Sequence, residues 1–467
     1  MPDPAAESGI PGPALAQLRR VCRHGLSLDE TERVAYSYDN SRKHCLPDAV
    51  AFVESHQQVS QVVEICCQYR IPIVARGRGT GTTGGTVPLQ HGLVLSLERM
   101  NRILHLDPDN RLIVVEPGIT NAEVQRAAAQ EGFFWAPDPT SAEYCTVGGN
   151  LGFNSAGPKA VKYGTTRENT LGLKAVIGTG ETIITGVHTT KGVVGYDLTR
   201  LLIGSEGTLA IITEATLKLT PLPQNKITLQ LVYQDVNSAA KAVSAIMRQP
   251  AIPCALEFMD RHSLDLIRHH AELQIPAQAS ALLIVEIDGY ESSLREGADR
   301  LIAAASNDAL IKSAVADNRQ QAEQLWAARK QLSPALRKIA PKKINEDVVV
   351  PVSHIPQLIE RLDALAEQYA ITIVNFGHAG NGNIHVNLLI DPENREQAEN
   401  AQACLSDLFD LVLSLGGTLS GEHGVGLEKR DFINREIDPV SMALMRKIKQ
   451  QFDPQGILNP DKIFPLA

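Results

Sequence analysis

The order of apolar and polar positions divides the first half of the chain into short strands and helices. The pattern predicts a helix near Ala14–Cys22, a strand at Ala49–Val53, a helix at Val59–Tyr69 and a strand at Ile71–Ala75. The hydroxyl of Thr120 can cap a further helix. The other predicted segments are Leu93–Leu97, Ile103–Leu106, Leu112–Val115, Asn121–Ala129, Leu173–Ile177, Thr182–Ile184 and Ala210–Leu219. This mixture indicates an α+β domain over residues 1–222.

A hinge is expected at residues 221–223, because Pro221 and Pro223 lie between strand signals and end regular pairing. Beyond it, strands alternate with amphipathic helices, which predicts a second α+β domain over residues 223–415, with helices covering one face of its sheet. Its predicted segments are Ile227–Val232, Ser238–Met247, Ala255–Met259, Ser263–His269, Ala281–Glu286, Leu294–Ala305, Ile371–Asn375, Ile384–Leu389 and a helix from Glu396. A last helix is predicted at Pro439–Phe452.

Composition excludes several classes of function. The 467 residues include 44 Lys and Arg against 53 Asp and Glu, a net charge of −9, which argues against nucleic acid as a partner. No apolar run reaches the roughly 18 residues of a membrane span. The seven cysteines form no C-x-x-C pair, so no thiol zinc site or redox dithiol is indicated. Met1–Pro4 lacks the basic start of a secretion signal, so we expect a cytoplasmic location, with peripheral attachment to the inner membrane as the alternative.

Glycines are concentrated at 77–85, 148–157, 204–207 and 416–426, where we expect the backbone to approach another group closely. Residues 79–84 follow a predicted strand and satisfy G-x-G-x-x-G, and Glu98 follows at about the distance typical of NAD-binding folds. That motif must open a helix, however, and Pro88 and Gly92 leave no room for one. The loop is therefore predicted to hold a pyrophosphate with backbone N–H groups alone, a flexible turn being the alternative.

The glycine-rich blocks after Arg76, Thr146 and Ile203 resemble the FAD-binding domain of the vanillyl-alcohol oxidase and p-cresol methylhydroxylase superfamily, in the same order and with similar spacing. The resemblance implies that the first block binds the pyrophosphate and that the others lie along the flavin, the ribityl chain and the adenosine. Some relatives carry a covalent histidine where this chain has Thr80, so noncovalent FAD is expected. The implied FAD contacts are Arg76, Gly77, Arg78, Gly79, Thr80, Gly81, Thr82, Thr146, Gly148, Gly149, Asn154, Ser155, Gly157, Gly204, Glu206 and Gly207.

A cluster of histidines marks the C-terminal half. His385 shares a strand face with Asn387, and the Gly380–Gly382 turn can fold His378 back towards His385. Glu422 and His423 form a second polar pair flanked by glycines. Two imidazoles and one carboxylate are typical ligands of a divalent metal with open positions. The alternative is that these are hydrogen-bonded loop histidines.

This half resembles the FAD-linked D-2-hydroxyacid dehydrogenases, which include D-lactate dehydrogenase, D-2-hydroxyglutarate dehydrogenase and the glycolate oxidase flavoprotein subunit. The resemblance implies metal ligands at His378, His385 and Glu422, a catalytic base at His423 and a substrate contact at Asn387. Zinc is the usual metal of the family, with manganese or iron as alternatives. Asn459 lies in a closing motif that resembles the family's flavin-contacting end, but Asp461 stands where glycine is common.

The substrate carboxylate needs a cation, and Arg329 and Ser333 lie four residues apart on one face of a predicted helix that Pro334 is expected to bend or end. The resemblance implies that Arg329 binds the carboxylate and that Ser333 assists it. A family lysine is matched only by Lys343, two positions early, with Asn345 in register. A contact with a distal carboxylate of the substrate is therefore not implied. A solvated charge on the helix surface is the alternative for Arg329.

Together these features predict a two-domain flavoprotein with an FAD domain, an α+β substrate or cap domain, and residues 416–467 returning to the FAD domain. The expected reaction is oxidation of a D-lactate-like 2-hydroxy acid, with electrons passing to a quinone, a cytochrome or an electron-transfer flavoprotein. A homodimer is the candidate assembly. The alternatives are an alcohol or phenol oxidase on the same fold, a flavin-carrying subunit without catalysis, and an NAD-dependent dehydrogenase, which Pro88 disfavours.

Overall fold

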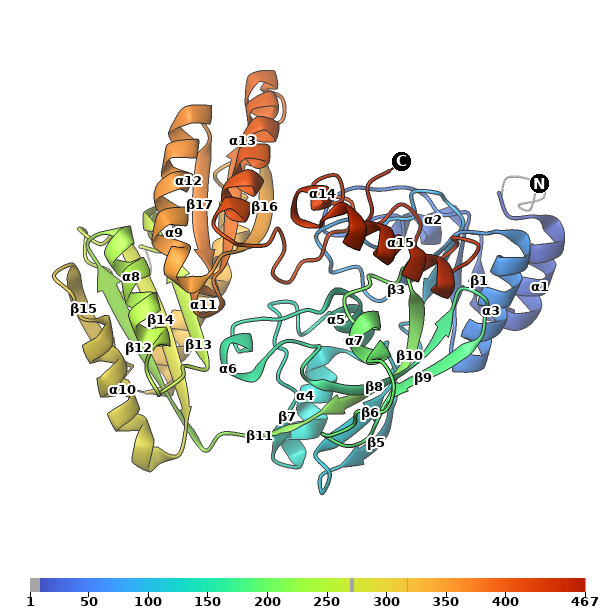
Figure 1. The fold of residues 1–467 in the computed structure, drawn as a ribbon, viewed down its shortest axis with the longest axis horizontal. Coiled ribbons are helices and arrows are strands. Elements are labelled where there is room, and N and C mark those ends of the chain that lie inside the picture. Colours follow the sequence, from blue (N-terminus) through green and yellow to red (C-terminus); the bar gives the residue numbers. More distant parts are fainter. Residues whose placement is uncertain (1–8, 269–272, 317, 467) are drawn as a thin grey trace. The chain divides into compact units, whose positions relative to one another are not determined.

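The computed structural model of the chain describes residues 9–268, 273–316 and 318–466 (Figure 1). The expectation drawn from Met1–Pro4 and the last residue of the predicted helix Ser263–His269 lie outside these ranges. The chain forms two compact units: residues 1–156, 164–222 and 422–467 make the first, and residues 157–163 and 223–421 make the second. The return to the first unit thus begins at Glu422, six residues later than position 416, and residues 157–163 join the second unit.

The first unit begins with a sheet in which β2 (Ala49–Phe52), β4 (Leu93–Ser96) and β3 (Ile73–Arg76) are parallel and β1 (Leu26–Ser27) is antiparallel. Apolar residues of α1 (Gly12–Cys22) and α3 (His56–Tyr69) form one core with these strands. No helix lies between β3 and β4, in agreement with the argument against a Rossmann loop. The short helical segments nearby are η2 (Arg23–Gly25) and α2 (Glu30–Ala35).

An antiparallel sheet of order β5-β6-β10-β8-β9 completes the first unit among the described residues. Its core includes apolar residues of α4 and α5 and the half-buried Ile448 and Phe452 of α15. The strands are β5 (Ile103–Asp107), β6 (Leu112–Val115), β8 (Thr170–Ile177), β9 (Thr182–Gly186) and β10 (Ala210–Lys218). The helices are α4 (Asn121–Gln130), α5 (Val147–Phe153), α7 (Leu198–Leu202), α14 (Ile433–Glu436) and α15 (Pro439–Phe452).

Both ends of the described chain pack into the first unit. Ile457 and Asn459 hydrogen-bond to Ile73, so the C-terminal segment runs alongside β3. The predicted hinge is only partly irregular, because β11 (Thr220–Pro221) still pairs with β7 (Phe133–Phe134). Pairing therefore continues through Pro221, and the second unit resumes at Pro223.

The second unit is built on an antiparallel sheet of order β15-β12-β14-β13-β17-β18-β16, as far as the described residues show. Its two halves repeat one arrangement, since β14 lies between β12 and β13 just as β18 lies between β16 and β17. The halves meet where β13 pairs with β17. The strands are β12 (Asn225–Tyr233), β13 (Ala255–Met259), β14 (Ala281–Gly289), β15 (Leu310–Val315), β16 (Lys342–Val349), β17 (Thr372–Gly377) and β18 (Asn383–Ile390).

Helices cover both faces of this sheet, not one face as expected. On one face α8 packs against α10 and α12, and α12 packs against α13. On the other face α9 and α11 form an apolar core with Met259, Leu282 and Phe376. The helices are α6 (Ala160–Tyr163), α8 (Val236–Met247), α9 (Arg261–Ile267), α10 (Glu291–Ala305), α11 (Arg319–Leu336), η4 (Val352–His354), α12 (Ile355–Tyr369), η5 (Ala379–Asn381) and α13 (Arg395–Ser414).

Pro334 does not end its helix at once, because α11 continues to Leu336. Several regular elements of the second unit, among them β15, β16 and α12, were not expected from the pattern of apolar positions. None of the described helices combines the length and the apolar composition that crossing a membrane requires.

Candidate functional site

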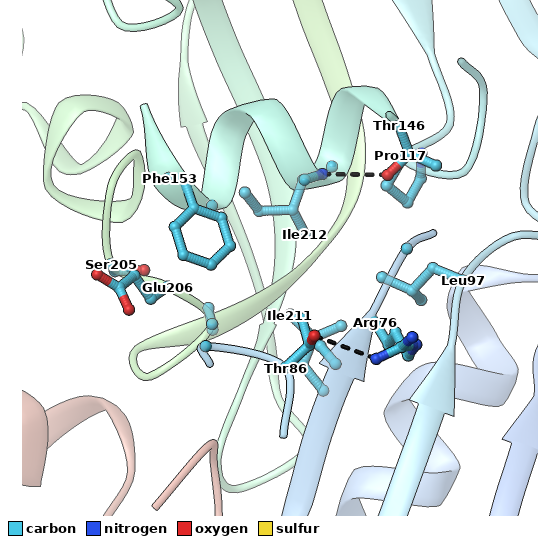
Figure 2. Close-up of a pocket in the computed structure, with 18 residues that line it drawn as sticks. Arg76, Thr86, Leu97, Pro117, Thr146, Phe153, Ser205, Glu206, Ile211 and Ile212 are labelled. Atoms are coloured by element: carbon cyan, nitrogen blue, oxygen red, sulfur yellow. Dashed lines mark hydrogen bonds between the residues drawn. The ribbon is translucent and has the colours of Figure 1, made fainter. Parts of the chain in front are cut away.

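A cleft opens in the first unit between α5, the end of β3 and the start of β10 (Figure 2). Its walls are formed mainly by glycines and by apolar side chains, with a few polar groups. The lining residues are Ala75, Arg76, Gly77, Gly85, Thr86, Leu97, Pro117, Thr146, Gly148, Gly149, Gly152, Phe153, Ser205, Glu206, Gly207, Ala210, Ile211 and Ile212.

Two glycines of the cleft wall are required by close packing. A Cβ atom on Gly77 would lie 2.2 Å from Oγ1 of Thr146, and one on Gly148 would lie 2.7 Å from Cβ of Pro117. Thr146 in turn caps α5 by accepting a hydrogen bond from the Gly149 N–H at 3.2 Å. The glycines therefore let the loop after β3 and the first turn of α5 approach each other across the wall of the cleft.

Arg76 lines the cleft, but its guanidinium contacts other side chains of the protein. It donates to Oγ1 of Thr86 at 3.1 Å and lies 5.5 Å from the centre of the Tyr36 ring. Burial lowers the pKa of Arg76, and the nearby Asp39 carboxylate opposes that shift. The side chain thus braces the loop, whose tip is held by Asn40 through hydrogen bonds to the carbonyls of Thr80 and Gly81.

The structure brings only some of the predicted FAD contacts to this cleft. Those that line it are Arg76, Gly77, Thr146, Gly148, Gly149, Glu206 and Gly207. Those that do not are Arg78, Gly79, Thr80, Gly81, Thr82, Asn154, Ser155, Gly157, Gly204 and Asn459, and Gly157 belongs to the second unit. Sequence reasoning missed the apolar part of the wall, formed by Leu97, Pro117, Phe153, Ile211 and Ile212. Ordinary apolar residues in strands, helices and loops carry no signal of a binding site.

Asn459 and Asp461 are explained by backbone geometry. Asn459 Nδ2 donates to the carbonyls of Gly85 and Glu206, so it ties two cleft loops together from behind. Asp461 has φ of 62°, in the left-handed region where glycine is most easily accommodated and where aspartate is tolerated better than most residues. Aspartate at position 461 is therefore compatible with the turn.

Glu206 connects this cleft to the segment that carries His423. Its carboxylate accepts hydrogen bonds from the N–H groups of Val425 at 2.6 Å and Gly426 at 2.9 Å. Burial raises the pKa of Glu206 to about 7, although both N–H groups act in the opposite direction. Thr83 donates to the carbonyl of His423 at 3.3 Å. The backbone of the His423 segment is therefore fixed to the first unit on both sides of Gly424.

In the second unit, a row of polar side chains lies on the sheet face that α9 and α11 cover. Glu257 of β13 is fully buried, and its two oxygens contact Nδ1 of His378 at 2.5 Å and Nε of Arg329 at 2.7 Å. The Arg329 guanidinium also lies 4.6 Å from the centre of the Phe376 ring. Burial tends to raise the pKa of Glu257, but His378 and Arg329 outweigh it and hold the pKa at about 2.

The neighbouring strands extend this row. His385 and Asn387 share one face of β18, as expected, and Asn387 donates to the carbonyls of Val374 and His385. Both of these contacts use Nδ2. The other polar atom of the amide, Oδ1 of Asn387, is buried with no hydrogen-bond partner among the described residues. Ser333 is engaged by Lys343, whose Nζ lies 2.8 Å from its hydroxyl.

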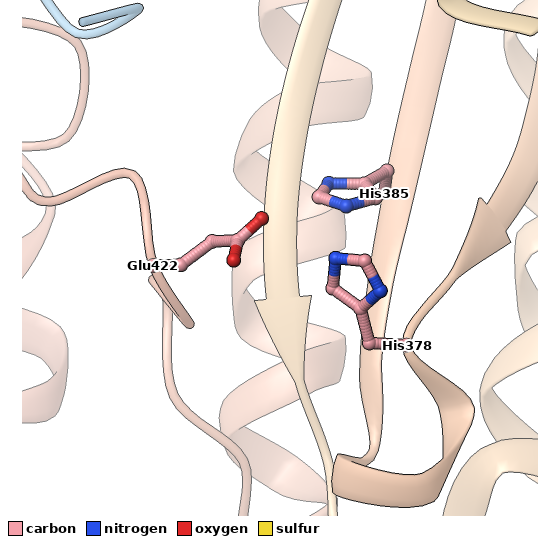
Figure 3. A group of neighbouring side chains, drawn as sticks. All are labelled: His378, His385 and Glu422. Carbon is pink, nitrogen blue, oxygen red and sulfur yellow. The ribbon is translucent and has the colours of Figure 1, made fainter. Parts of the chain in front are cut away.

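The predicted metal ligands come together. The His378 and His385 rings lie 5.2 Å apart and nearly perpendicular, on either side of the η5 turn. Glu422 follows Gly421, whose N–H donates to Asp347 of β16. One nitrogen of each ring and one Glu422 oxygen all lie within 4.8 Å of one another (Figure 3). His423 Nε2 lies 4.0 Å from the Glu422 carboxylate, with 18% of its side chain exposed.

Sequence reasoning missed Glu257, which contacts two of the predicted site residues. The available signal was a carboxylate at the centre of Ala255–Met259, an otherwise apolar strand in which all five residues are buried. A charged group in such a strand requires a partner, and here the partners lie 72 and 121 residues away in the sequence.

Comparison with known proteins identifies the class. Residues 222–463 match the family described as "FAD linked oxidases, C-terminal domain", and residues 47–186 match the "FAD binding domain" family. The chain therefore belongs to the FAD-linked oxidases, a family of flavoprotein oxidoreductases.

Individual relatives refine this picture. The chain is 38% identical to glycolate oxidase subunit GlcD of Bacillus subtilis over 433 residues, which cover 92% of each chain. It is 31% identical to a mitochondrial D-lactate dehydrogenase [cytochrome] of Arabidopsis thaliana over 461 residues, 98% of this chain and 81% of that one. Among solved structures, p-cresol methylhydroxylase has the same fold, with a TM-score of 0.77, 16% identity and 97% of both chains covered. The predicted fold class is thereby confirmed.

Proposed function

We propose that this protein is an FAD- and metal-dependent dehydrogenase that oxidises a D-lactate-like 2-hydroxy acid to the 2-oxo acid. The observation that carries the proposal is the grouping of His378, His385 and Glu422 next to His423 in an FAD-linked oxidase. An alcohol or phenol oxidase has no evident use for two histidines and a carboxylate in this arrangement. Relatives named D-lactate dehydrogenase and glycolate oxidase support a small 2-hydroxy acid as the substrate.

The cleft of the first unit fits FAD in two respects. The close approaches at Gly77 and Gly148 bring the loop after β3 and the first turn of α5 together along the wall, where the phosphate and ribityl groups would lie. The apolar part of the wall, with Phe153, Ile211 and Ile212, suits an aromatic ring system. The first unit is thus the proposed FAD domain, and Thr80 leaves no histidine for a covalent link at that position. Bound FAD supplies the acceptor for the hydride that leaves Cα of the substrate.

The donor set of His378, His385 and Glu422 fits a divalent cation such as zinc, with manganese and iron as alternatives. The Nδ1 contact of His378 with Glu257 leaves Nε2 as its ligand atom, the usual pattern of a metal-binding histidine. A cation held by these residues would lower the pKa of the substrate hydroxyl. The residues offer two nitrogens and one oxygen, so positions remain for the substrate.

The chain's own residues bind and orient the substrate and move its proton. Arg329 binds the substrate carboxylate through the guanidinium nitrogens that Glu257 does not contact. Asn387 offers its Oδ1 to a substrate donor, and the Lys343–Ser333 pair lines the region beside it on the same sheet face. His423 accepts the hydroxyl proton, for which an imidazole has a suitable pKa near neutral pH.

Further features of the proposal concern the protein's surroundings. The electrons leave the flavin for a non-oxygen acceptor: a quinone, a cytochrome or an electron-transfer flavoprotein. The Arabidopsis relative, named for a cytochrome, supports this direction of transfer. We also propose a cytoplasmic location, with peripheral attachment to the inner membrane as the alternative, and a homodimeric assembly.

The base assignment is tested with His423→Asn. The variant is expected to keep its FAD and its metal content, because the anchoring contacts of this segment involve the backbone and Glu206. Flavin reduction by D-lactate in stopped-flow mixing should slow by about 10²–10⁴-fold, the range typical of a lost general base. His105→Asn, at an exposed position of β5, is the matched control and should reduce at the wild-type rate. Unchanged reduction in His423→Asn would refute the assignment.

A further inference from the structure

We propose that Glu257 is a positioning residue that couples the metal ligand His378 to the carboxylate-binding Arg329. This inference rests on the proposed function, because it concerns the same site. Glu257 is placed by the pairing of β13 with β17, in which Phe258 lies opposite Gly377 and so brings Glu257 beside His378. The two contacts use different oxygens of one carboxylate: Oε1 with His378 and Oε2 with Arg329.

The Glu257 carboxylate and its contacts with His378 and Arg329 are buried and therefore constrained. The side chain of Glu257 is 1% exposed, that of His378 7% and that of Arg329 11%. A buried carboxylate without partners is strongly unfavourable, so the Glu257 carboxylate requires both contacts to stay in place. The same requirement acts in reverse, since neither His378 nor Arg329 can rotate away without leaving the carboxylate incompletely satisfied.

The consequence for His378 is a fixed tautomer and ring orientation. With Nδ1–H donated to Glu257, the ring is held in the tautomer whose Nε2 carries the lone pair that can bind a cation. Carboxylates that hold metal-binding histidines in this way typically strengthen metal affinity by about 10–100-fold. The ring is held further by its edge contact with His385.

The consequence for Arg329 is a fixed guanidinium plane. The Nε contact with Glu257 and the stacking on Phe376 leave the rest of the fork in one orientation. A planar fork held in this way can bind a carboxylate through two hydrogen bonds at a small entropic cost. Glu257 therefore sets the distance between His378, at the hydroxyl end of the substrate, and Arg329, at the carboxylate end.

Glu286 provides a matched control on the same sheet face. It lies on the adjacent strand β14 and is also buried, but its partners are Thr228, Lys226, Trp326 and Cys254, which the proposed mechanism does not use. Replacement of either glutamate by glutamine removes one buried charge at constant shape. In Glu257→Gln the amide can accept from only one partner and presents its NH₂ group to the other.

The test uses FAD-loaded protein from which metal has been removed by chelation. Its zinc affinity is measured by competition with a chromogenic chelator, and its steady-state kinetics are measured on D-lactate. For Glu257→Gln we expect zinc affinity to fall by about 10–100-fold and KM to rise with FAD content unchanged. Glu286→Gln should match the wild type in zinc affinity and KM. Glu257→Asp, which keeps the charge but is too short to reach both partners, should show a smaller loss.

Equal zinc affinity in Glu257→Gln and wild type would overturn the inference while leaving the proposed function intact. If Glu257→Gln does not accumulate as folded, FAD-loaded protein, Glu257→Asp decides in the same assay, and wild-type zinc affinity in that variant would overturn the inference. A purely structural ion pair would lower the thermal midpoint in both glutamine variants and leave both zinc affinities unchanged. Wild-type protein that binds no zinc, manganese or iron would refute the proposed metal site and the inference together.

Discussion

Glu206 has two roles: it lines the binding cleft, and it anchors the backbone of the segment that carries His423. It lines the cleft of the first unit, and the same carboxylate holds the N–H groups of Val425 and Gly426. Its φ of 53° lies in the left-handed region, an uncommon conformation for glutamate. A change in the charge of Glu206 therefore acts on the cleft and on the position of the His423 segment at once.

The pKa of Glu206 predicts a pH dependence of stability. Because burial raises the pKa from 4.5 to about 7, the folded state binds this proton more tightly than the unfolded state. The stability contributed by Glu206 is present below pH 4.5 and is lost as the pH rises towards 7. Glu206→Gln mimics the protonated form, so the thermal midpoint of wild type should fall relative to that of the variant over this interval. A difference between the two midpoints that is independent of pH would contradict the prediction.

Helix α5 is the element that shapes the cleft. Its first turn packs against Pro117 through Gly148, whose N–H also donates to the Pro117 carbonyl at 2.8 Å. Gly148→Ala places a methyl group against Pro117, so the helix must shift. We expect a loss of about 1–3 kcal/mol in stability and a lower FAD content in the purified protein.

Thermal unfolding and the ratio of flavin to protein absorbance measure both effects of Gly148→Ala. Gly12→Ala in α1 is the control, because a Cβ atom there meets no other atom within 4 Å. Stability and FAD content of Gly148→Ala at the level of the control would show that the close approach of α5 is dispensable.

Among the elements, the sequence predicted most strands and helices of the second unit, including the strands of Glu257 and His385, but missed β15, β16 and α12. Strand β16 illustrates the reason: Lys343, Asn345 and Asp347 share the face that His385 and Asn387 occupy on β18. The face of β16 that points into the protein is therefore polar, so the strand lacks the usual alternation of polar and apolar residues by which strands are recognised. The glycine-rich loops were recognised because their conformation demands glycine, whatever their partners.

In the whole molecule, the arrangement of the site depends on strand order, which local patterns do not encode. His378 and His385 are close in sequence, and the turn between them predicted their approach. Glu257 meets His378 only because the two halves of the second sheet join through β13 and β17. No periodicity in Ala255–Met259 indicates which strand becomes its neighbour, so Glu257 could be recognised only in the structure.

The central claim is that D-2-hydroxy acids reduce the bound flavin with the help of a metal held by His378, His385 and Glu422. The most direct measurement is anaerobic mixing of the FAD-loaded protein with D-lactate or L-lactate while the visible absorbance of the flavin is followed. The account predicts bleaching by D-lactate and not by L-lactate, a rate reduced by orders of magnitude after chelation, and recovery when zinc is restored. A flavin that no 2-hydroxy acid bleaches in the presence of metal, or a reduction rate unchanged by chelation, would contradict it.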